Sequence, residues 1–98
     1  MAARTVYYTK VGYADLERLH AFLSSKSRRT ADRAINKIRR AVIRLGDFPE
    51  AGRPTPDLNP VHRELLVPFG HSGYVVLYGL DGPDVVIISV RHQREAGY

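Results

Sequence analysis

The apolar residues in the first half of the chain are spaced as in amphipathic helices that follow a short strand. The β-branched and aromatic run at residues 6–9 predicts the strand. Farther on, Leu16, Leu19 and Leu23 recur at i, i+3 and i+7, which is the spacing of a surface helix that packs one face inward. This pattern predicts a helix over residues 11–23.

A second predicted helix has a more regular pattern. Its apolar residues keep a helical period over about four turns, and they are Ala31, Ala34, Ile35, Ile38, Val42 and Leu45. On the opposite side of the helix lie Arg29, Arg33, Arg40 and Arg44. The serine-rich segment 24–27 offers N-cap oxygens, and Gly46 followed by Pro49 ends the helix. The two patterns together predict a helical hairpin.

Three apolar segments in the second half of the chain predict strands. They follow a turn-rich crossing at residues 48–60 and cover residues 63–67, 74–80 and 85–92. Because the turn between the last two segments is short, these strands should pair antiparallel. We therefore predict one α+β domain over residues 1–98, with the order β-α-α-β-β-β. The helical hairpin packs on one face of a small antiparallel sheet.

Side chains alternate between the two faces of a strand, so the last predicted strand can be divided into two sets. Val86, Ile88, Val90 and His92 share one face, and Val85, Ile87, Ser89 and Arg91 share the other. We expect the first set to lie against the helices, which leaves the other face uncovered as a groove for an extended or helical partner. Arg91 then points into this groove and His92 toward the rim of the core. A bulge before Arg91 would reverse this arrangement.

The charge balance favours polyanionic partners. The 98 residues include 15 Lys and Arg against 10 Asp and Glu, which gives a net charge of +5 and a pI near 9.9. Cysteine is absent, which excludes disulfides and thiol chemistry and fits the reducing cytoplasm. No apolar run approaches the about 20 residues of a membrane-spanning helix or forms a signal peptide. We expect a cytoplasmic protein without a membrane partner.

Few residues indicate chemistry. The four histidines lack metal-ligand spacing, and no serine lies in a Gly-x-Ser-x-Gly turn, so no metal, cofactor or nucleophile is predicted. Metal-free RNA cleavage stays open, because it needs cations that stabilise the phosphorane and a group that moves the 2′-hydroxyl proton. The candidate catalytic residues are Arg53, Arg63, Arg91 and His92. Alternatively, Arg53 solvates a turn and Arg63 caps a strand edge.

Two tyrosines could be read either as core residues or as a platform for nucleic-acid bases. Tyr74 and Tyr78 share one face of a predicted strand. Stacking platforms usually carry neighbouring Arg or Lys side chains, which this strand lacks. The two rings are therefore predicted to belong to the core.

An ordered set of residues resembles the ParE branch of the ParE/RelE toxin superfamily. The set spans about residues 5–94 and comprises Asp15-Leu16, Leu19, Phe22-Leu23, Ala31, Ile38, Leu45, Pro49, Gly52-Arg53, Arg63, Tyr74, Tyr78, Val90, His92 and Arg94. Its most specific parts are the Pro-x-x-Gly-Arg segment and the Val-x-His-x-Arg ending. The resemblance implies a toxin of a type II toxin–antitoxin system, which a cognate antitoxin wraps and neutralises. In the ParE branch the implied target is DNA gyrase, and in the RelE branch the implied activity is ribosome-dependent mRNA cleavage.

Three hypotheses follow from this resemblance. The first is a gyrase inhibitor, not an enzyme, whose target contacts are Arg91, His92 and Arg94. The second is a metal-independent endoribonuclease that uses Arg53, Arg63 and Arg91 to stabilise phosphate and His92 to transfer the proton. The third is a non-toxic module that only binds an antitoxin. In each case Arg33, Arg40 and Arg44 are the expected antitoxin-binding residues, because they would attract the acidic side chains of such a partner.

Overall fold

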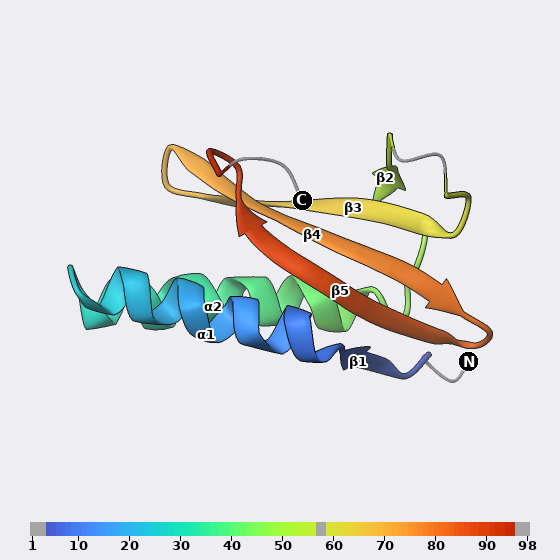
Figure 1. Cartoon of the computed structure of the whole chain (residues 1–98), viewed down its shortest axis with the longest axis horizontal. Helices are drawn as coiled ribbons and strands as arrows, with labels where there is room; N and C mark the ends of the chain where they lie inside the picture. The colour runs from blue at the N-terminus through green and yellow to red at the C-terminus, as the bar shows by residue number, and fades with distance from the viewer. Residues whose placement is uncertain (1–3, 57–58, 96–98) are drawn as a thin grey trace.

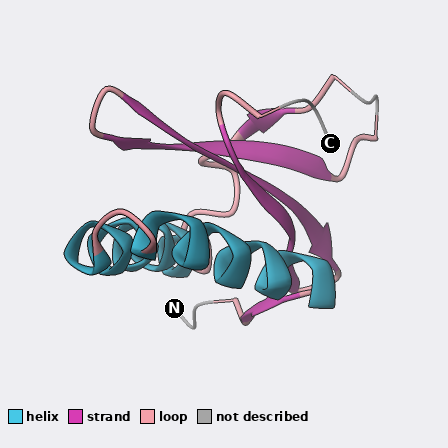
Figure 2. Ribbon diagram, turned by 60° about the vertical axis from the view of Figure 1, so that its left-hand side comes forward, coloured by secondary structure: helices cyan, strands magenta, loops and turns pink. Residues whose placement is uncertain are grey.

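The computed structural model describes residues 4–56 and 59–95 and has two layers (Figure 1). The elements are β1 (Val6–Tyr8), α1 (Lys10–Ser24), α2 (Arg28–Arg44), β2 (Arg53–Pro54), β3 (His62–Phe69), β4 (Ser72–Asp81) and β5 (Asp84–His92). Both helices lie on the same side of one twisted sheet, as Figure 2 shows. This arrangement confirms the predicted α+β fold with a helical hairpin on one face.

The sheet is larger and less uniform than predicted. Its strand order is β1-β5-β4-β3-β2, and β3, β4 and β5 are antiparallel to one another as expected. The first strand, however, pairs parallel with β5, so the sheet is mixed and not purely antiparallel. The two-residue strand β2, which pairs with the start of β3, was not predicted. This strand contains Pro54. Proline has no backbone N–H to donate a hydrogen bond between strands, so it is found in edge strands or outside strands.

Both helices begin at hydroxyl N-caps. The Thr9 hydroxyl accepts a hydrogen bond from the amide of Gly12 at 3.0 Å, and that of Ser27 accepts from the amide of Thr30 at 3.2 Å. The predicted cap in the serine-rich segment is therefore confirmed. Each bond pairs one of the amides that a helix N-terminus leaves without an intrahelical partner.

The core lies between the hairpin and the sheet. The helices contribute apolar side chains that are buried on the face turned to the sheet, among them Leu16, Ile38 and Leu45. The central strand β4 contributes Tyr74 and Tyr78, which are 3% and 0% exposed. Both tyrosines are core residues, as predicted.

The division of β5 into two faces was half wrong. Leu77 pairs with Ser89 but the next residue, Tyr78, pairs with Ile87, so Ile88 is an extra residue that forms a β-bulge. Before the bulge, Val85 and Ile87 face the helices with 0% exposure, in place of the predicted Val86 and Ile88. Beyond the bulge, Val90 and His92 face the helical side and Arg91 the opposite side, as predicted.

The far face of the sheet is also less open than predicted. Val75 and Leu77 of the central strand point away from the helices, yet they are only 3% and 8% exposed. Leu77 lies between Glu64 and Ser89 of the two neighbouring strands. Because cross-strand neighbours lie about 5 Å apart, their side chains shield a residue between them. Within the described residues, the centre of this face is therefore covered at Val75 and Leu77.

Candidate functional site: a basic-rimmed groove and the tip of the sheet

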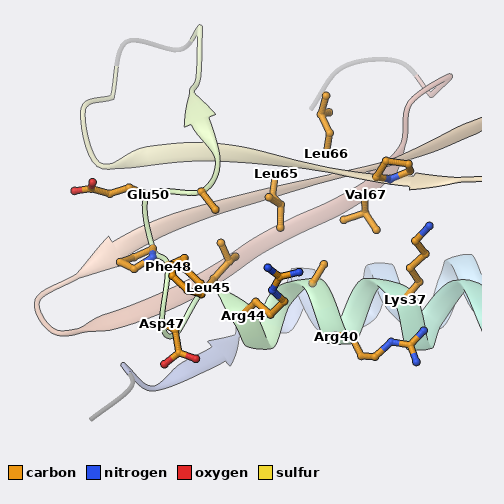
Figure 3. Close-up of a pocket in the computed structure, with 14 residues that line it drawn as sticks. Lys37, Arg40, Arg44, Leu45, Asp47, Phe48, Glu50, Leu65, Leu66 and Val67 are labelled. Carbon is orange, nitrogen blue, oxygen red and sulfur yellow. The ribbon is translucent and has the colours of Figure 1, made fainter. Parts of the chain in front are cut away.

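A groove of about 960 Å³ lies between the C-terminal half of α2 and strand β3 (Figure 3). Its apolar lining comes from the inward side of both elements and includes Leu45, Leu65 and Val67. The turn after α2 closes one end with Phe48, which is 59% exposed. Leu66 also borders the groove, but its side chain points away from α2 (Figure 3) and its 41% exposed surface lies on the other side of β3. Exposed apolar surface like that of Phe48 marks a site for a partner.

Basic side chains border this groove on the helix side. Lys37, Arg40 and Arg44 are exposed residues of α2 that belong to its lining. Of the predicted antitoxin-binding arginines, the structure thus places Arg40 and Arg44 at the groove. Arg33 is exposed on the same helix but does not line the groove. The groove therefore combines an apolar floor with cations on its helix side, while the acidic Asp47 and Glu50 lie at the end that the turn closes.

The turn that closes the groove is held by a buried tyrosine. The Tyr78 hydroxyl donates to the carbonyl oxygen of Pro49 at 2.7 Å and accepts from the amide of Gly52 at 2.9 Å. Burial raises the pKa of Tyr78, and this effect outweighs the lowering by the Gly52 amide and by nearby Arg63. The phenol therefore remains neutral at physiological pH and available as a donor.

Two of the predicted catalytic residues make contacts that hold this turn and the adjoining strand β2. The guanidinium of Arg63 donates from Nη1 to the carbonyl oxygen of Gly52 at 2.7 Å. Arg53 donates from Nε to Oε1 of Glu64 at 3.1 Å, and the Glu64 side chain is only 7% exposed. An ion pair with one buried partner fastens β2 to β3. The Gly-Arg part of the sequence motif thus has a structural role.

The Val-x-His-x-Arg ending forms a separate site, the tip of β5. The imidazole of His92 meets the ring of Tyr74 edge-on, with 5.3 Å between ring centroids. Its Nδ1 accepts from the amide of Arg94 at 3.1 Å, while the His92 amide donates to Glu95 at 2.8 Å. Glu95 also pairs with Arg18 of α1 at 3.1 Å. These contacts fix the backbone of the tip, and the Arg94 side chain is exposed beyond it.

The four predicted catalytic residues do not converge. Directly paired residues point to the same face of a sheet. Arg63 pairs with Tyr78 and His92 with Tyr74, so both lie on the helical face. The remaining pair lies on the other face, because Arg53 stands opposite Glu64, a neighbour of Leu77, and Arg91 stands opposite Val75.

Distance along the sheet separates the same residues. The strand positions opposite Arg63 and His92 are four residues apart on β4, which corresponds to about 13 Å. The two residues also lie on different neighbours of β4, which adds about 10 Å across the sheet. One scissile phosphate therefore cannot contact all four side chains in this arrangement.

Other kinds of site are not found in the described part of the chain. Within residues 4–56 and 59–95, no cluster of three or more His, Asp or Glu side chains is placed to hold a metal ion. No helix described there is long and apolar enough to cross a bilayer.

The groove itself was missed by sequence analysis. It is built from α2, the turn after it and β3, which are separated by residues 52–61 in the chain. A weak signal was present, because Leu65, Leu66 and Val67 make both faces of one strand apolar. Such a strand near the edge of a sheet has more apolar surface than the fold alone can cover.

A helical hairpin packed on one face of a mixed sheet, beside an apolar groove with basic residues on its helix side, defines a small two-layer α+β protein. The chain belongs to the ParE toxin family of type II toxin–antitoxin systems, because the family model described as "ParE toxin of type II toxin-antitoxin system, parDE" matches residues 6–97. The predicted membership of the ParE/RelE superfamily is thereby confirmed.

Two curated relatives carry the name RelE, of the same superfamily, and a solved structure shares the fold. Toxin RelE1 of Caulobacter vibrioides is 33% identical over 81 residues, which cover 83% of this chain and 84% of the relative. Toxin RelE3 of the same organism is 36% identical over 81 residues, which cover 83% and 85%. A chain of the chromosomal ParDE TA system from P. aeruginosa superposes with a TM-score of 0.76 over 92% of this chain and 96% of that chain. At 19% identity, the last match shows the shared fold.

Proposed function

We propose that this ParE-family toxin inhibits DNA gyrase and that a cognate antitoxin neutralises it by occupying the groove between α2 and β3. The observation that carries the antitoxin part is the groove itself, with an apolar floor and the cations Lys37, Arg40 and Arg44 along one side. An amphipathic helix or strand with acidic residues on one edge is complementary to both features. Arg33, farther along the helix, extends the same positive potential.

The target part of the proposal concerns the tip of β5. His92 and Glu95 order the backbone there, and Arg94 projects from it into solvent. Arg91 lies on the face of the sheet that points away from the helices. The ordered backbone of this cationic tip favours contact with a large enzyme, because little backbone entropy is lost when the tip docks.

A supercoiling assay with purified gyrase tests the target. Excess toxin should stop supercoiling and leave cleaved DNA, and Arg94→Ala should weaken both effects at least tenfold. Arg4→Ala, another exposed arginine, provides the matched control. Normal supercoiling and religation in excess toxin would refute gyrase inhibition.

Association kinetics test the antitoxin site. Arg40→Glu with Arg44→Glu should slow association with the antitoxin about tenfold at low salt, because reversed charge removes electrostatic steering. Adding Arg33→Glu should slow it further. Lys10→Glu with Lys26→Glu is the control, because it makes the same change of charge at two residues outside the groove. Equal rates for the two double variants would exclude steering at the groove.

The other two hypotheses have distinct outcomes. Cleavage of mRNA predicts new 5′ ends on translated messages, read by primer extension after induced expression. A non-toxic module predicts normal growth when the chain is expressed without its antitoxin. Gyrase inhibition predicts arrested growth with DNA breaks and unchanged mRNA ends.

A further inference from the structure

The exposed side of α2 carries a continuous row of cations, which we call the α2 ridge. Its members are spaced four, four, three and four residues apart, and they are Arg29, Arg33, Lys37, Arg40 and Arg44. At about 100° and 1.5 Å per residue, this spacing places all of them within one narrow stripe about 22 Å long. All five residues are exposed.

The α2 ridge is not neutralised by the protein's own acids. Within residues 4–56 and 59–95, no ion pair joins any of its members to a carboxylate. The helix has a single acidic residue, Asp32, and that carboxylate binds His20 of α1 at 2.8 Å. Like charges three or four residues apart repel one another along the stripe.

The N-terminal turn of α2 adds to this positive potential. Arg28 and Arg29 stand in the first turn, which contains no acidic residue. Helix N-termini carry the positive end of the macrodipole and favour negative side chains, so the arginines oppose the local preference. A polyanion bound to the α2 ridge would reduce both the repulsion between the cations and the unfavourable interaction of Arg28 and Arg29 with the helix dipole, since it places negative charge along the row and at the helix start.

We infer that the α2 ridge binds the phosphate backbone of duplex DNA without sequence preference. The ridge extends beyond the apolar groove at its N-terminal end, because Arg29 and Arg33 do not line the groove that Lys37, Arg40 and Arg44 border. A protein partner needs an apolar interface core, whereas nonspecific DNA binding needs only cations. Duplex DNA presents one negative charge per about 1.7 Å of its axis, which supplies several phosphates along a straight 22 Å row. This inference does not depend on gyrase inhibition.

Salt-dependent binding tests the inference. Full-length toxin is titrated into a fluorescein-labelled duplex of about 20 base pairs of arbitrary sequence, and anisotropy is read at several salt concentrations. The wild type should give a slope of log K against log salt of about −4, since each neutralised phosphate contributes about −0.9. Arg29→Gln with Arg33→Gln should make the slope about two less negative, and Arg29→Lys with Arg33→Lys should restore it.

Control variants separate the ridge from net charge and from folding. Lys10→Gln with Lys26→Gln removes the same charge elsewhere and should leave the slope within about 0.5 of wild type. Unchanged circular dichroism and an unchanged urea midpoint show that the Arg29/Arg33 variant is folded. Equal slope changes in the two glutamine variants would overturn the inference, as would absence of duplex binding at low salt. Tighter, ridge-dependent binding of single-stranded RNA or of polyglutamate would also overturn it, because the ridge would then serve a different partner.

Discussion

Removing the hydroxyl of Tyr78 should lower the free energy of unfolding by about 2–3 kcal/mol. In Tyr78→Phe the ring that fills the core is kept, but two hydrogen bonds of 2.7 and 2.9 Å are lost. The amide of Gly52 is then buried without its acceptor, and the carbonyl of Pro49 loses a donor. Each loss costs about 1–1.5 kcal/mol, which gives the sum stated. The turn that closes the groove depends on these two bonds.

Urea denaturation followed by circular dichroism measures this loss. With a slope of about 1 kcal/mol per molar urea for a small domain, the midpoint should fall by about 2–3 M. Tyr7→Phe is the matched control, because Tyr7 is 41% exposed and its hydroxyl lies 3.4 Å from a carboxylate oxygen of Asp81. That variant should lose less than about 0.5 kcal/mol. Equal losses in the two variants would show that the buried hydroxyl does not hold the turn.

The same substitution should change the response of stability to alkaline pH. Burial raises the pKa of Tyr78 above its ordinary value of 10.0, so the unfolded chain ionises at a lower pH than the folded one. The stability linked to the neutral phenol is therefore complete below pH 10 and is lost as pH rises through the folded pKa. Burial also raises the pKa of Tyr8 and of Tyr74. Part of the decline of stability at alkaline pH should therefore remain in Tyr78→Phe. An equally steep decline in the variant would contradict this account.

Three further substitutions test contacts elsewhere in the fold, each by urea denaturation. Gly52→Ala places a Cβ 2.6 Å from a backbone carbonyl of β3 and should cost about 1–3 kcal/mol, and full stability would disprove that close contact. Asp15→Ala removes the carboxylate that accepts from the Val90 amide at 2.9 Å and should cost about 1–3 kcal/mol. Asp15→Asn keeps an oxygen that can accept this hydrogen bond, so it should recover most of the lost stability. No recovery would indicate that the negative charge of Asp15 is what matters. Ser27→Ala removes the α2 N-cap and should cost about 1 kcal/mol, and no loss would make that cap dispensable.

Periodicity predicted the elements well because it reports burial within a single segment. The helix predicted around 31–45 is α2, Arg28–Arg44, and the strand predicted at 85–92 is β5, Asp84–His92. Pairings between distant segments leave no such local pattern. The parallel contact between β1 and β5 joins residues about 80 positions apart in the chain, as in the pair Val6 and Val85. Nothing near either residue in the sequence specifies that partner.

The candidate site was harder to predict for a related reason. Arg53 and Arg63 were grouped with Arg91 and His92 because all four are cationic or can carry a proton. Strand register then decides which face each one occupies, and register depends on the bulge at Ile88 and on the short strand β2. Neither irregularity follows from residue type.

The Asp-Leu pair of α1, which belongs to the pattern that resembles ParE, makes its contacts next to the bulge. At the bulge the Thr9 hydroxyl lies 3.1 and 3.0 Å from the carbonyl oxygens of Ile87 and Ile88. Two residues later, the Val90 amide donates to Asp15, while Leu16 packs into the core. The first turns of α1 thus bind the backbone of β5 where regular pairing is interrupted.

Most residues that carry the family resemblance make contacts within the fold, and Arg94 is a member of that pattern that is instead exposed. Asp15, Gly52 and Tyr78 are occupied by contacts within the fold. The side chains of Arg40 and Arg94 are exposed, and the structure does not require them for packing. A substitution of the first kind should lower the urea midpoint and reduce all activities together under conditions in which the variant unfolds. One of the second kind should change binding to a single partner while the urea midpoint stays at its wild-type value, and the groove, the tip and the α2 ridge can be separated on that basis.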